Sequence, residues 1–205
     1  MTPDLTVLDI ELSRAFDSTY RAMEKLVNSG KVKHIVRQFV TIGVSNFSSP
    51  KINRLLQTAK IKPAVNQIEC HAQWPQKAVV KLCQEKETHV RAFGPLGCTP
   101  IPALMGRHGP SPLEDKTVLS IVAKYAKTPV QVLLCYLLHR GISVIPMRNN
   151  LECIVENHDC RFDLADEDFR LLDTIAGESG ELRVRNLESR DYLGFDNYNE
   201  KVEEA

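Results

Sequence analysis

The sequence predicts an α/β fold, because strand-like and helix-like segments alternate along its 205 residues. Helical patterns with one apolar face separate short apolar, β-branched runs of strand length at 40–44, 64–68, 89–93 and 142–145. Such alternation is typical of parallel strands that are joined by right-handed helical crossovers. A chain of this length buries a sizeable core, and we expect residues 1–205 to form a single domain.

The helical patterns have recognisable ends. Apolar side chains at three- and four-residue spacing predict a first helix over 16–29, which Gly30 ends. A second helical pattern covers 48–60, with Ser49 as its cap and Pro50 in its first turn. Three further patterns follow at 75–86, 113–127 and 129–141.

One segment, 31–44, is too long for a single strand. It would make a strand of fourteen residues with Arg37 and Gln38 in its middle, whereas strands usually have about five or six residues. We therefore expect a break or a short hairpin near 36–39, and we treat 31–40 as an irregular insertion.

Two architectures are compatible with the alternation, an open doubly wound sheet and a (β/α)8 barrel. Neither GxGxxG nor GxxxxGK occurs in the sequence, which favours the barrel over a dinucleotide-binding open sheet. A full barrel needs about 250 residues, whereas this chain supplies four strand-helix units between a lead at 1–15 and a tail at 180–205. The prediction is a partial barrel, whose open edges would favour self-association.

Composition narrows the possible partners. The chain carries 26 basic and 26 acidic residues, so neither nucleic acid nor an anionic membrane is an expected partner. There is no secretory signal pattern and no apolar run long enough to cross a bilayer, so a cytoplasmic location is expected. The six cysteines form no CxxC pair and the six histidines show no i, i+4 spacing, so no metal site is predicted.

Polar and aromatic residues close the predicted strands, which is where a barrel of this kind places its active site. Neutral hydroxyl and amide side chains suit an amide or a hydroxylated ligand, and a phenyl ring can stack on a planar one. A serine-asparagine pair can also simply cap a helix or shape a turn. The first run ends in Ser45-Asn46, and the second contains Asn66-Gln67 and continues as Glu69-Cys70-His71. The third ends in Phe93-Gly94-Pro95 and the fourth in the stretch from Pro146 to Asn150.

Several motifs resemble the aldo-keto reductase superfamily and follow the order in which that family shows them. They are GKVKHI, IGVSNF, PAVNQIECH, PLG, LED, a late VIP, ENHDCRFDLADED and a tail ending in GFDNYNE. The resemblance runs from about residue 16 to the C-terminus, and the chain is similar to the fungal aldose, xylose and glycerol reductases. It implies roughly the last four units of a (β/α)8 barrel and NADP-dependent reduction of small aldehydes, ketones or sugars.

The resemblance also implies a cofactor site. Residues that match the family's motifs would contact the nicotinamide carboxamide (Ser45, Asn46, Gln67), its ring (Phe93), the pyrophosphate (Gly94, Leu96) and the adenine (Glu156, Asn157). Further cofactor-binding residues are expected at the end of VIP and directly after it: Pro146, Arg148 and Asn149. His71 and Trp74, which follow a strand end, are candidates for lining the substrate pocket.

Three departures bear on the cofactor. Phe93 stands where the family usually has tyrosine, so the stacking face is kept without the hydroxyl. Met147-Arg148 replaces the usual lysine-serine pair, and Cys153 replaces an arginine. The replaced cations clamp the adenosine 2′-phosphate in the family. Arg148 can recover part of that grip, since guanidinium binds phosphate in bidentate fashion. NADP(H) is therefore the expected cofactor, with NAD(H) as the alternative.

The resemblance assigns no catalytic residue to this chain. The family's tyrosine proton donor and its lysine, aspartate and histidine partners precede the segment that corresponds to 16–29. Proton delivery is worth about a hundredfold to ten-thousandfold in rate. The alternative function is thus a truncated, inactive product that binds nucleotide or a protein partner. The extra VRQFVT at 36–41 leads to the hypothesis that the insertion and the missing half are gene-model errors.

Overall fold

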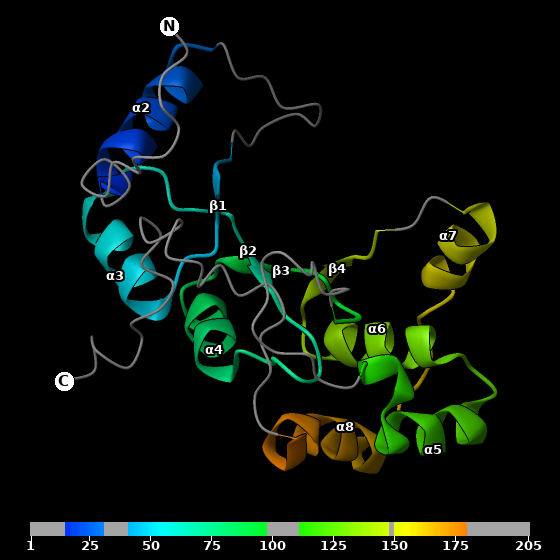
Figure 1. The fold of residues 1–205 in the computed structure, drawn as a ribbon. Coiled ribbons are helices and arrows are strands. Elements are labelled where there is room, and N and C mark those ends of the chain that lie inside the picture. The colour runs from blue at the N-terminus through cyan, green and yellow to red at the C-terminus, as the bar shows by residue number, and fades with distance from the viewer. Residues whose placement is uncertain (1–14, 31–40, 98–110, 148–149, 180–205) are drawn as a thin grey trace, which may run out of the picture. The chain divides into compact units, whose positions relative to one another are not determined.

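The structure is a computed structural model of the chain, and it describes residues 15–30, 41–97, 111–147 and 150–179 (Figure 1). The elements in chain order are α2 (Phe16–Asn28), β1 (Gly43–Ser45), α3 (Ser49–Thr58), β2 (Val65–Glu69), α4 (Lys77–Glu85), β3 (His89–Phe93), the 3-10 helix η2 (Pro112–Glu114), α5 (Lys116–Tyr125), α6 (Pro129–His139), β4 (Ser143–Ile145), α7 (Leu151–His158) and α8 (Asp166–Ser179). The expected break near 36–39, the 180–205 tail and all but residue 15 of the lead lie outside the described residues.

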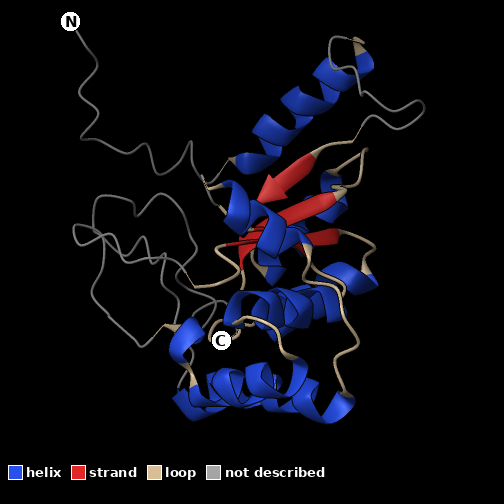
Figure 2. Cartoon of the chain, turned by 90° about the vertical axis from the view of Figure 1, so that its right-hand side faces the viewer, coloured by secondary structure: helices blue, strands red, loops and turns tan. Residues whose placement is uncertain are grey.

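The strands form a parallel sheet in the order β1-β2-β3-β4, as the alternation of strands and helices predicted. Strand β1 pairs with β2 from Gly43↔Val65 to Ser45↔Gln67. Strand β3 pairs with β4, with Phe93 opposite Ile145 at the end of the ladder. Figure 2 shows these strands in red among the helices that alternate with them. The α/β class predicted from the sequence is confirmed.

A side-chain cap explains where α5 begins, whereas α3 begins without a hydrogen bond from its cap side chain. The cap of α3 is Ser48, so the prediction of Ser49 as cap was wrong by one residue; Pro50 lies in the first turn as predicted. The pattern predicted over 113–127 is divided into η2 and α5, because the side chain of Asp115 accepts from the backbone N–H groups that open α5.

Two helices, α7 and α8, had no predicted counterpart. Asn150 caps α7, since its side chain accepts a hydrogen bond from the backbone N–H of Glu152. Helix α8 begins with Asp166, Glu167 and Asp168, and acidic residues in a first turn interact favourably with the helix dipole. These two N-terminal signals were available in the sequence.

Contacts divide the chain into two compact units. Of the described residues, the first unit comprises 15–30, 41–67 and 78–89, and the second comprises 68–77, 90–97, 111–147 and 150–179. In the first unit, Tyr20, Ile42 and Leu55 are buried together. Phe16 and Phe47 pack against this cluster. Their two phenyl rings also pack edge to face with each other, with centroids 4.9 Å apart. Helix α2 is thus joined to β1 and α3 by an apolar core.

A buried carboxylate holds α2 to the chain that follows α3. Glu24, 4% exposed, accepts hydrogen bonds from the backbone N–H groups of Lys60 (2.7 Å) and Ile61 (2.8 Å). The hydroxyl of Tyr20 donates to the carbonyl of Ile61 over 2.9 Å. One turn of α2 therefore satisfies the backbone of a segment that has no helix or strand partner of its own.

We expect Glu24→Ala to lower the free energy of unfolding by about 1–2 kcal/mol, because two half-buried N–H groups would lose their acceptor. Urea denaturation followed by circular dichroism measures this loss. Glu24→Gln keeps an acceptor oxygen and should lose clearly less; equal losses for both variants would contradict the assignment.

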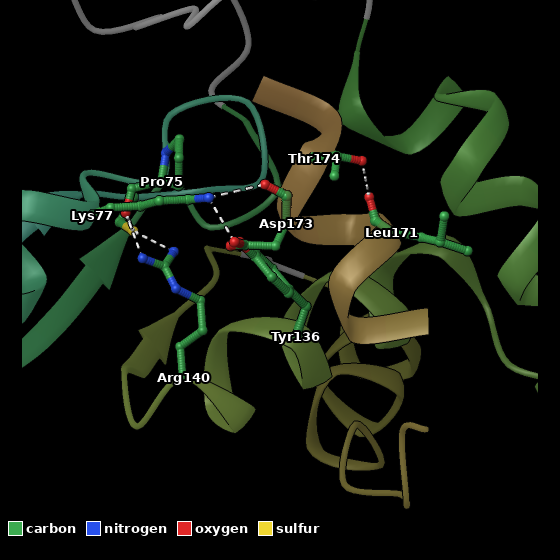
Figure 3. Close-up of polar contacts among 8 residues, drawn as sticks. Pro75, Lys77, Tyr136, Arg140, Leu171, Asp173 and Thr174 are labelled. Carbon is green, nitrogen blue, oxygen red and sulfur yellow. Dashed lines mark hydrogen bonds and ion pairs between the residues drawn. The ribbon is translucent and has the colours of Figure 1, made fainter. Parts of the chain in front are cut away.

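In the second unit, polar contacts join the segment after β2 to helices α6 and α8 (Figure 3). Asp173 of α8 receives hydrogen bonds from Lys77 Nζ (2.5 Å) and from the hydroxyl of Tyr136 (2.8 Å). Arg140 at the end of α6 donates to the carbonyl of Pro75 over 2.7 Å and contacts the Cys70 sulfur at 3.8 Å. Burial raises the pKa of the Cys70 thiol to about 11, so it is held as an unreactive thiol.

Candidate functional site

The Ser45-Asn46 pair forms a turn that is tied to the neighbouring strand. The N–H of Asn46 and the hydroxyl of Ser45 both donate to the carbonyl of Gln67, each over 2.9 Å. Asn46 has φ +57°, in the left-handed region that asparagine tolerates better than most residues. The strand therefore ends at Ser45, because the left-handed conformation of Asn46 cannot continue an extended strand. The serine is left exposed and the asparagine half-buried.

Asn66 supports this turn from the adjacent strand. Its side chain is fully buried, donates to the carbonyl of Phe47 (2.9 Å) and accepts from the N–H of Phe47 (3.3 Å). Its amide nitrogen also lies 3.8 Å from the sulfur of Cys83, a thiol whose pKa is raised by burial. Alternation along β2 gives Asn66 and Gln67 opposite faces. Asn66 lies inside β2 (Val65–Glu69), and the sequence did not predict it as a site residue.

One acceptor in the turn lacks a donor. Among the described residues, the buried Oδ1 of Asn46 has no hydrogen-bond partner. An unsatisfied buried carbonyl oxygen costs about 1–3 kcal/mol. Because Ser45 spends its hydroxyl hydrogen on Gln67, its oxygen also remains an acceptor. Two acceptor oxygens on one turn suit a ligand that offers N–H groups, such as a primary amide.

The end of β3 forms a second predicted part of the site, within the second unit. Phe93 is half-buried, and its carbonyl accepts from the N–H of Cys70 over 3.3 Å. The chain then turns through Gly94 (φ +57°) and Gly97 (φ +74°), whose N–H bonds back to Gly94 over 3.0 Å. Leu96 is 8% exposed, so only a small part of this side chain reaches the surface. The predicted pyrophosphate contact here would come largely from backbone.

The third predicted part follows β4. Pro146 is half-buried and Met147 is 85% exposed, while Arg148 and Asn149 lie outside the described residues. On α7, Cys153 and Glu156 are half-buried and Asn157 is 9% exposed. Within the described parts of the chain, the Oδ1 atom of Asn157 has no hydrogen-bond partner. Asn157 thus offers a second acceptor that an exocyclic amine could use.

The two candidate substrate residues stand in a tight turn after β2. His71 and Trp74 exchange backbone hydrogen bonds of 3.2 and 2.9 Å. The His71 ring is fully buried, with Nε2 3.3 Å from Oε1 of Glu69, whereas Trp74 is half-buried. Contact of His71 with a substrate therefore stays a prediction, and it would require movement of this turn.

Other features do not add to the site. The described residues contain no cluster of metal-ligating side chains. They also contain no single helix that is long and apolar enough to cross a membrane. Helices α5 and α6 reach such a length and apolar composition only when taken together, and a 95° bend separates them. A pocket of about 280 Å³ in the second unit lies beside α6 and contains none of the predicted site residues. Its walls are Cys135, Leu138, His139, Arg161, Phe162 and Asp163.

Comparison with known proteins shows where this fold and these motifs occur. Residues 3–176 match the Aldo/keto reductase family, so the match begins earlier than residue 16. Aldo-keto reductase family 1 member A1-A of Danio rerio is 37% identical over 166 residues, which cover 78% of this chain and 47% of the relative. The NAD(P)H-dependent D-xylose reductase of Scheffersomyces stipitis is 39% identical over 155 residues, covering 74% and 46%.

Solved structures agree with the sequence comparison. An aldo-keto reductase of the silkworm Bombyx mori, in complex with NADPH, is 35% identical with a TM-score of 0.69. The superposition covers 82% of this chain and 49% of the silkworm chain. The chain thus spans about half the length of the relatives it matches, as predicted for a partial (β/α)8 barrel. On these grounds the chain belongs to the aldo/keto reductase family of oxidoreductases.

Proposed function

We propose that this chain carries the cofactor-binding part of an NADP-dependent oxidoreductase that reduces small aldehydes, ketones or sugars. Relatives named as reductases of D-xylose and as a glycerol 2-dehydrogenase support the substrate class. The observation that carries the proposal is the buried Oδ1 of Asn46, which has no partner among the described residues. It lies on the Ser45-Asn46 turn, where the hydroxyl oxygen of Ser45 is a second acceptor.

The proposed contacts follow from the donor and acceptor chemistry. NADPH supplies a hydride when it is bound. Asn46 Oδ1 and Ser45 Oγ would accept from the carboxamide N–H₂ of the nicotinamide, and the amide of Gln67 would pair with the same group. The ring of Phe93 would stack on the nicotinamide. Asn157 Oδ1 would accept from the adenine amine, with Glu156 beside it.

Preference for NADP(H) rests on Arg148. Met147 is an exposed apolar side chain and Cys153 is a neutral one, so neither supplies the positive charge that a 2′-phosphate favours. A single guanidinium can bind phosphate through two parallel hydrogen bonds. We therefore propose NADP(H) as the preferred cofactor, with a smaller margin over NAD(H) than two additional cations would provide.

Titration of the full chain with NADPH, followed by nicotinamide fluorescence, tests the proposal. Asn46→Ala should weaken binding about tenfold, which corresponds to ~1.4 kcal/mol, because an acceptor for the carboxamide is lost. Asn53→Ala, at an exposed position on α3, is the matched control and should bind like the parent chain. Absence of any saturable fluorescence change in the parent chain would overturn the proposal.

A second candidate function, nucleotide binding without catalysis, is favoured by the state of the described tyrosines. Their hydroxyls bond to Ile61 (Tyr20), Asp168 (Tyr125) and Asp173 (Tyr136). Burial raises the pKa of Tyr20 to about 12 and also raises that of Tyr136. These hydroxyls serve structure and are poorly suited to proton donation.

An aldehyde turnover assay decides between the two candidate functions. Turnover above background supports the reductase, and saturable NADPH binding without turnover supports nucleotide binding without catalysis.

A further inference from the structure

Asn66 bridges the place where pairing between β1 and β2 ends. The ladder closes with Ser45 opposite Gln67, and Asn66 is paired with Val44 inside it. Beyond the ladder, the Asn66 amide bonds to both the N–H and the carbonyl of Phe47, at 3.3 and 2.9 Å. The side chain therefore takes the place that a further strand residue would have taken in satisfying the backbone.

The two bonds control the residue that precedes Phe47. Asn46 is anchored on its N-terminal side by its own N–H on the Gln67 carbonyl (2.9 Å). The bonds from Asn66 anchor it on its C-terminal side, through Phe47. A left-handed conformation such as that of Asn46 costs about 1–3 kcal/mol and persists only where the surroundings over-determine it. Both anchors come from β2, so that strand determines the conformation of the turn.

We propose that Asn66 is a positioning residue, which holds the Ser45-Asn46-Phe47 turn so that the Asn46 and Ser45 oxygens face the nicotinamide carboxamide. The inference rests on the proposed function for its ligand, but its structural part concerns the turn alone. Asn66 acts through the backbone of Phe47 and touches no cofactor. Its full burial and its contact with Cys83, on the helix side of β2, keep it away from the ligand face.

The first measurement needs no ligand. We compare Asn66→Ala with Cys83→Ala in the full chain by hydrogen-deuterium exchange. Cys83→Ala is the matched control, because it removes the other polar neighbour of Asn66 and leaves a similar packing defect at a fully buried site. Asn66→Ala should speed exchange in residues 41–48 about tenfold, with α3 and α4 unchanged. Faster exchange throughout the first unit, or none in 41–48, would overturn the inference.

The second measurement connects the turn to the ligand. Asn66→Ala should weaken NADPH about tenfold and leave the affinity for adenosine 2′,5′-bisphosphate, which lacks nicotinamide, unchanged; Cys83→Ala should alter neither. Equal weakening of both ligands would overturn the positioning role. Failure of the parent chain to bind NADPH would overturn the proposed function, whereas the exchange comparison would still decide whether Asn66 holds the turn.

Discussion

Leu55→Ala should lower the free energy of unfolding by about 2–5 kcal/mol, the range for removing a fully buried leucine side chain. Leu55 is completely buried against Tyr20 and Ile42, in the core that joins α2, β1 and α3. The neighbouring backbone is held by Glu24 and by the β1-β2 ladder. These restraints oppose collapse of the cavity, and the cost of such a cavity rises with the volume that remains open.

Urea denaturation monitored by circular dichroism measures the Leu55 effect. Leu26→Ala provides the matched control, since this leucine belongs to the same unit but is 48% exposed. The control should lose less than half as much free energy as Leu55→Ala. Equal losses would show that the first unit has no rigid core around Leu55.

Asp173→Ala should lower the free energy of unfolding by about 2–3 kcal/mol, because it leaves the buried hydroxyl of Tyr136 without its acceptor. Lys77 also loses a partner, but that ammonium is 55% exposed and contributes less. Asp173→Asn keeps an acceptor oxygen for the hydroxyl and is the control. Equal losses for the two variants would contradict the assignment of the main cost to Tyr136.

The same carboxylate predicts an acid dependence. Burial opposes the charge of Asp173, but hydrogen bonds from Lys77 and Tyr136 outweigh it and lower its pKa below the ordinary 3.8. A lowered pKa contributes stability above the unfolded value, and this contribution is lost as the pH falls through the folded value. The parent chain should therefore lose stability below about pH 4. Asp173→Asn should show a shallower loss over that range, and parallel curves would contradict the prediction.

Much of the fold could be predicted from local patterns. The apolar run at 89–93 coincides with β3, and the helical spacing over 16–29 ends within one residue of α2. Helix α7 was missed for a physical reason. In α7, apolar side chains such as Leu151 (74% exposed) and Val155 (61% exposed) face solvent in the structure. A helix with exposed apolar residues lacks the clear division into two faces on which a periodicity argument depends.

Some features of the candidate site could likewise be predicted from the sequence, and others could not. Ser45, Asn46 and Gln67 stand out in the sequence as polar side chains in or after apolar runs, and the family resemblance implies their place in the site. The support from Asn66 could not be predicted, since its bonds join residues nineteen positions apart. The burial of His71 could not be predicted from the sequence either, because the exposure of its side chain depends on the turn that pairs it with Trp74.

The sequence by itself determined the α/β class, the family and the polar residues in and after the strand-like runs, because these depend on periodicity and on motifs of neighbouring residues. The tertiary structure alone decided which of those side chains remain available to a ligand. It locks Asn46 in a left-handed turn with a buried acceptor, assigns Asn66 to the backbone of Phe47 and encloses His71. The physical reason is that burial and hydrogen-bond satisfaction are set by contacts between segments far apart in the chain.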